Sequence, residues 1–131
     1  MQVIVAYLVS GAAFLALDML WLGVVARGLY SSEMGALLAN PIKLWAAIAF
    51  YAVYLVGLVV FAVLPGVNGQ SVVTAAGYGA LLGLVAYATY DLTALAVIRD
   101  FPVKLALVDM AWGVVVSSIA AAVAAAVVLR F

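Results

Sequence analysis

The chain has 131 residues, of which 72% are hydrophobic and 8% are charged, and its formal net charge is zero. Soluble domains average roughly 45–50% apolar and about 25% charged residues, so this composition excludes an ordinary soluble domain and predicts an integral membrane protein. Because His and Cys are absent, we expect no metal, no haem, no disulfide and no other cofactor. A neutral chain without a basic stripe also argues against a nucleic-acid partner.

Four apolar stretches, each long enough to cross a bilayer as a helix, follow one another along the chain. Turn-forming and charged residues separate them, and the predicted spans are about 3–25, 42–64, 72–97 and 103–130. The first stretch has no basic n-region and no clear cleavage site, so we interpret it as a retained span. Short links make consecutive helices antiparallel neighbours, and we predict an all-α, four-helix transmembrane bundle with up-down-up-down topology in one domain, residues 1–131.

All three prolines lie near predicted helix ends. Pro41 and Pro102 open the second and fourth spans, where a missing N–H costs nothing. Pro65 closes the second span within the turn-rich segment PGVNGQ.

Basic residues gather on one side of the predicted bundle. By the positive-inside rule, the first and third links are cytoplasmic and both termini are external. For a bacterial chain this predicts a multi-pass protein of the inner, cytoplasmic membrane, in contact with the lipid bilayer. The four residues on the cytoplasmic side are Arg27, Lys43, Arg99 and Lys104, against Arg130 alone on the other.

Three of the five acidic residues fall inside predicted spans. At about 1.5 Å per residue, Asp18, Asp91 and Asp109 each lie roughly 9–10 Å inside the same cytoplasmic boundary. Lipid disfavours ionised side chains, so such acids usually face the bundle interior or a water-filled cavity. We therefore predict that the three carboxyl groups converge on a cytosol-facing pocket. Glu33 and Asp100 belong to the links and are ordinary solvated charges.

Aromatic residues accompany these acids. Trp21 and Trp112 each follow an Asp by three residues, on the same side of the helix. Because their helices are antiparallel, we expect the two indoles to bracket the acid layer, although Trp21 also suits an interfacial aromatic belt. The tyrosines can offer hydroxyl groups, or can simply pack with a local hydrogen bond. The tyrosines assigned to the ligand-binding pocket are Tyr51, Tyr87 and Tyr90.

Small residues form a ridge on the third span. Gly79 and Gly83 make a Gly-x-x-x-Gly pattern, which lets another helix backbone approach closely. That helix could belong to the same bundle or to a second copy, so a homo-oligomer through these glycines is one alternative.

Taken in chain order, LDMLWLG, FYAVYLVGLVVFAVLP, GALLGLVAYATYDLT and VDMAWG resemble a family of small bacterial membrane proteins known only as a domain of unknown function. The most specific motifs are D-x-x-W-L-G, Y-D-L-T and V-D-x-A-W-G. The family's Y-D-L-T is usually followed by Asn, where this chain has Ala94. Some relatives are encoded near lipid-modifying enzymes, so the resemblance implies a role in membrane lipids and no established activity.

The favoured hypothesis is a non-enzymatic membrane protein whose acidic and aromatic pocket binds a small cationic or amphipathic ligand. Carboxylate attraction and cation–π contact would hold this ligand. One version of the hypothesis adds transport of the ligand across the membrane. A four-helix multidrug transporter is a second hypothesis, supported by architecture alone. An enzyme or accessory protein of lipid modification, with Asp as general acid or base, is a third, although no nucleophile constellation supports catalysis. The fourth is a purely structural network of buried Asp residues.

Overall fold

The computed structural model describes residues 2–21, 23 and 44–130. The first link, which carries Arg27, Glu33, Pro41 and Lys43, lies outside the described residues, so the inferences that involve it stay predictions. Within the described part, four helices are long and apolar enough to cross a membrane: Gln2–Leu20, Leu44–Asn68, Val72–Val97 and Val103–Arg130. They pack against one another, which confirms the predicted all-α, four-helix bundle.

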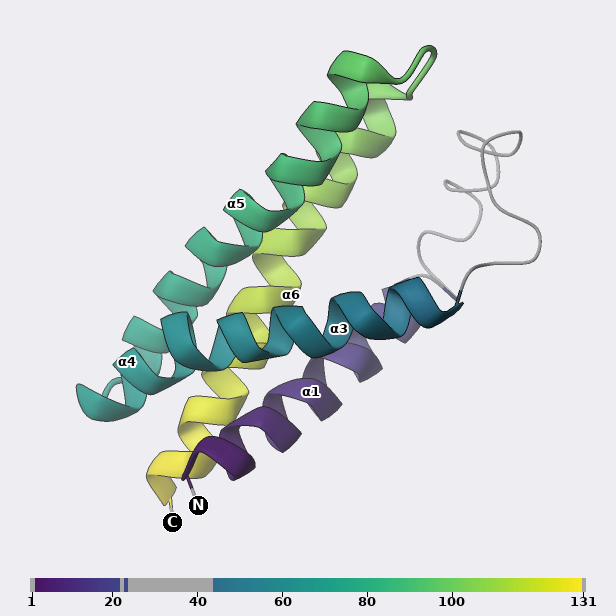
Figure 1. Cartoon of the computed structure of the whole chain (residues 1–131). Helices are drawn as coiled ribbons and strands as arrows, with labels where there is room; N and C mark the ends of the chain where they lie inside the picture. Colours follow the sequence, from purple (N-terminus) through teal and green to yellow (C-terminus); the bar gives the residue numbers. More distant parts are fainter. Residues whose placement is uncertain (1, 22, 24–43, 131) are drawn as a thin grey trace.

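The helices contact one another unequally. The helices α5 (Val72–Val97) and α6 (Val103–Arg130) run antiparallel, side by side, and make the most extensive contact in the molecule (Figure 1). The first helix, α1 (Gln2–Leu20), packs mainly on α6. The second helix consists of α3 (Leu44–Leu58), the π-helical segment η2 (Val59–Val63) and α4 (Leu64–Asn68), and its last two parts pack on α5. Figure 1 shows α1 and α3 crossing the α5–α6 pair at an angle rather than running level with it.

Small residues allow α5 and α6 to approach closely. A Cβ added to Gly79 would lie 2.7 Å from the Ser117 carbonyl oxygen, and one added to Gly83 would overlap the Gly113 carbonyl oxygen. Both glycines are therefore buried against α6 of the same chain. The close helix crossing expected at Gly79 and Gly83 thus occurs within the chain, and a homo-oligomer stays a prediction.

The second helix contains one widened turn. In η2, the N–H of Leu64 donates to the carbonyl of Val59, five residues back. Buried residues on this helix recur every four positions, whereas one turn of an α-helix takes 3.6 residues. The wider π-helical turn compensates for this difference and keeps the buried residues on one side of the helix. The buried pairs are Tyr54/Leu55, Leu58/Val59, Ala62/Val63 and Gly66/Val67.

Pro65 follows this widened turn and lies in the first turn of α4. In a regular α-helix the proline ring would clash with the carbonyl group four residues back. The π-helical turn changes the position of that carbonyl group relative to the ring. The interpretation of Pro65 as the end of the second helix is therefore wrong, because the helix continues to Asn68.

The link between α5 and α6 sets the register of two acids. The N–H of Ile98 donates to Ala94, and Asp100 adopts a left-handed conformation with φ of 61°, which Asp tolerates better than most residues. Phe101 is buried against Ala94 and Ala106, closing the turn. Because Asp91 and Asp109 lie equally far from the ends of this link, the hairpin places them opposite each other.

Candidate functional site

Asp18 joins three helices through its carboxyl group. The Tyr51 hydroxyl on α3 donates to its Oδ2 atom, and the Trp112 indole N–H on α6 donates to its Oδ1 atom at 3.0 Å. The side chain is only 7% exposed. A carboxyl group with both oxygens bonded in a nearly buried position meets its hydrogen-bonding requirement within the protein. Asp18 is therefore held in place by the bundle itself.

The two tryptophans pack together near Asp18. The rings of Trp21 and Trp112 are stacked, with centroids 4.6 Å apart and planes 6° from parallel. The expectation that they bracket the acid layer is wrong. The expectation assumed that the helices run level with one another, whereas α1 crosses the α5–α6 pair at an angle (Figure 1), and the two indole rings stack. Asp18 consequently lies at the level of Trp112, one turn along α6 from Asp109.

Asp91 and Asp109 form a pair across the α5–α6 interface. Their carboxyl groups are joined by a side-chain hydrogen bond. Asp91 is only 1% exposed, whereas Asp109 is partly exposed and lines a cavity. The three acids thus divide into a hydrogen-bonded pair, Asp91 and Asp109, and a separate Asp18.

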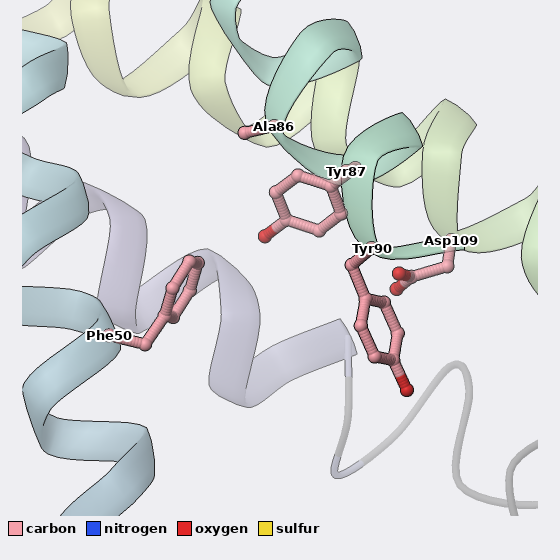
Figure 2. A pocket seen from close by; sticks show the side chains of 5 residues that line it. All are labelled: Phe50, Ala86, Tyr87, Tyr90 and Asp109. Atoms are coloured by element: carbon pink, nitrogen blue, oxygen red, sulfur yellow. The ribbon is translucent and has the colours of Figure 1, made fainter. Parts of the chain in front are cut away.

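The cavity beside Asp109 has a volume of about 310 Å³. Figure 2 shows Phe50 of α3 on one side and Tyr87, Tyr90 and Asp109 on the other. Tyr90 is 55% exposed and packs edge-on against Phe101, so this wall continues to the surface near the α5–α6 link. The residues lining the cavity are Phe50, Ala86, Tyr87, Tyr90 and Asp109.

Tyr87 connects the cavity with the Asp18 network. It interacts electrostatically with both Asp18 and Asp109, and its ring packs edge-on against Tyr54. A Cβ on Gly113 would overlap the Tyr87 ring, so Gly113 makes the room that this ring fills. The space beside Gly113 is thus occupied by a tyrosine.

The structure separates the eight predicted site residues into two groups. Tyr87, Tyr90 and Asp109 line the cavity, with Asp91 buried behind them in contact with Asp109. The remaining predicted residues form the adjacent Asp18 network: Asp18, Trp21, Tyr51 and Trp112.

Other residues of the site were absent from the prediction. Phe50 and Ala86 complete the cavity wall, and the only signal for Phe50 was its place beside Tyr51. Nearby, the Tyr54 hydroxyl and the Ser117 hydroxyl form a buried 2.6 Å hydrogen bond between α3 and α6. Among the described residues, no group of three or more acidic, His or Cys side chains could hold a metal ion.

Four apolar helices around a buried network of carboxyl and aromatic groups define a multi-pass membrane protein with four candidate spans. Residues 3–126 match the family described as "Predicted membrane protein (DUF2177)", and the chain belongs to that family. Comparisons with curated proteins and with solved structures gave no match. The family description carries no activity, so the function has to be argued from the site.

Proposed function

We propose that this membrane protein binds a small organic or amphipathic cation in the cavity beside Asp109. The observation that carries the proposal is the composition of the cavity wall, which combines one carboxyl group with the rings of Phe50, Tyr87 and Tyr90. Aromatic faces attract cations through their quadrupoles, most strongly where water is excluded, and a carboxylate adds direct charge attraction. Together these groups favour an alkylated ammonium over a neutral ligand.

The cavity volume limits the size of this ligand. At about 310 Å³, the cavity is at the lower end of the roughly 300–1,000 Å³ usual for small-molecule sites. It accommodates a small amine or the head of an amphipathic cation. Tyr90 and Asp109 of its wall lie near the α5–α6 link, which carries Arg99, and near Lys104 at the start of α6. By the positive-inside rule, the cavity is on the cytoplasmic side in this proposal.

Binding of benzyltrimethylammonium tests the proposal. The wild-type protein in nanodiscs is dialysed to equilibrium against the radiolabelled compound, beside Asp109→Asn, Phe50→Leu and Asp100→Asn variants. We expect saturable binding by the wild type, loss of that binding in Asp109→Asn, and weaker binding in Phe50→Leu. Asp100→Asn is the matched control, because it removes a carboxyl group from the exposed link and should bind as the wild type does.

Equal binding by the wild type and Asp109→Asn would show partition into the bilayer and would contradict the proposal. Uptake of the same compound into sealed vesicles then distinguishes a transporter from a binding protein. Transport predicts accumulation that Asp109→Asn abolishes, whereas binding alone predicts none.

A structural role is the better proposal for Asp18. Its two oxygens accept hydrogen bonds from α3 and α6, and it is absent from the cavity wall. Removing either donor should weaken the bundle, whereas removing Asp109 should primarily weaken cation binding. Unfolding measurements on the binding variants therefore separate the two roles.

A further inference from the structure

The hydrogen bond between Asp91 and Asp109 requires a proton. An ionised carboxylate can only accept hydrogen bonds, so one of the two carboxyl groups must donate. The pair as it stands in the structure therefore holds at least one proton.

Burial indicates which residue holds this proton. Asp91 is 1% exposed, and its Oδ2 atom has no hydrogen-bond partner among the described residues. A negative charge there would be costly, because buried charges need partners. Asp109 is partly exposed and lines the cavity, where a cation can approach it. Burial therefore favours the proton on Asp91, and the carboxyl group of Asp109 faces the cavity.

We propose that Asp91 is a protonation switch for the cavity, such that its proton and a cation bound at Asp109 oppose each other. This inference rests on the proposed function. When Asp91 loses its proton to solvent, the pair gains a negative charge and attracts a cation more strongly. By linkage, a bound cation in turn favours release of the proton. Asp91 acts here through Asp109, as a positioning residue.

Other titratable groups surround the pair. Tyrosine hydroxyls are ordinarily uncharged near neutral pH, which leaves carboxyl groups and amines as the groups that titrate or carry charge. Asp18 is bonded to Tyr51 and Trp112, outside the cavity wall, and Lys104 is exposed on α6. The titratable groups that interact with the pair are Tyr87 and Tyr90 on α5, and Tyr87 in turn interacts with Asp18 on α1 and with Tyr51 and Tyr54 on α3.

The switch is tested by measuring benzyltrimethylammonium affinity from about pH 5.5 to about pH 8.5, on either side of neutrality. For the wild type we expect affinity to rise with pH, by at most about tenfold per pH unit for one linked proton. Asp91→Asn keeps a donor toward Asp109 and cannot titrate, so it should bind the cation with a flat pH profile. Asp100→Asn should keep the wild-type slope, because its carboxyl group lies in the link.

A second measurement does not depend on a variant that folds. In weakly buffered solution, adding the cation to the wild-type protein near neutral pH should release protons, detected with an indicator dye. Binding with neither pH dependence nor proton release would overturn the switch and leave the proposed function standing. A wild-type slope in Asp91→Asn would overturn the assignment to Asp91. Failure of the wild type to bind the cation would overturn both proposals.

Discussion

Trp112 donates its indole N–H to Asp18 at 3.0 Å, joining α6 to α1 across 94 positions of sequence. Replacing Trp112 by Phe removes the donor and leaves a nearly buried carboxyl oxygen without it. We expect this to lower the free energy of unfolding by about 1–3 kcal/mol, the usual effect of leaving a buried polar group unsatisfied. Unfolding in mixed micelles by SDS, followed by circular dichroism, measures the change.

The control for this change is Trp45→Phe. Trp45 is 73% exposed at the start of α3, so the same substitution should alter stability by no more than about 0.5 kcal/mol. Equal effects at the two positions would show that the Asp18 bond contributes little.

Gly83→Ala should destabilise the α5–α6 pair. The added methyl group would overlap backbone atoms of Gly113, which cannot rotate away, and overpacking of this kind costs typically about 1–3 kcal/mol. Gly77→Ala is the matched variant on the same helix, since a Cβ there meets nothing within 4 Å. It should be neutral or stabilising by up to about 1 kcal/mol, because Ala favours a helix over Gly. Thermal unfolding of both variants distinguishes them, and an equally stable Gly83→Ala would contradict the close crossing.

The hydrogen bond between Tyr54 and Ser117 should appear as a coupling energy. In a double-mutant cycle of Tyr54→Phe and Ser117→Ala, we expect about 0.6 kcal/mol, the average for interhelical bonds in membranes, and at most about 1.7 kcal/mol. Tyr78→Phe combined with Ser117→Ala provides the comparison, because Tyr78 is 50% exposed and should show no coupling. Additive effects of Tyr54→Phe and Ser117→Ala would contradict an energetically significant bond.

The orientation inferred from the basic residues can be tested by labelling, because the chain has no cysteine. In right-side-out vesicles, an impermeant maleimide should label the Asn68→Cys variant and spare Ile98→Cys. Inside-out vesicles should show the reverse pattern, and detergent should expose both positions. The opposite result in right-side-out vesicles would invert the assigned topology.

Hydropathy and residue type were sufficient for the architecture and for the broad location of the acids. Four apolar stretches led to four helices, and the cost of charge in lipid correctly indicated that Asp18 and Asp91 are buried. The pattern of Gly79 and Gly83 correctly indicated a close helix crossing, although it could not identify the partner as α6 of the same chain.

The contacts within the site could not be predicted, because they depend on how the helices cross. Counting depth along level helices placed Trp21 and Trp112 on opposite sides of the acids, whereas the tilt of α1 stacks them together. Sequence reasoning found Tyr87, Tyr90 and Asp109 of the cavity wall but missed Phe50 and Ala86, which carry no polar signal. A cavity is defined by the space that neighbouring side chains leave unfilled, and one-dimensional periodicity does not record it.

The widened turn at Val59–Val63 has a consequence for length variation in relatives. A π-helical turn holds one more residue than an α-helical turn would, while the segments on either side keep their rotation about the axis. Deleting one residue there would restore a regular α-helix without turning Tyr54 away from Ser117 or Val67 away from the core. The same deletion in the middle of α5 would rotate Asp91 relative to Gly79 by about 100°. Natural deletions of a single residue should therefore be tolerated in this segment of the second helix and selected against in α5.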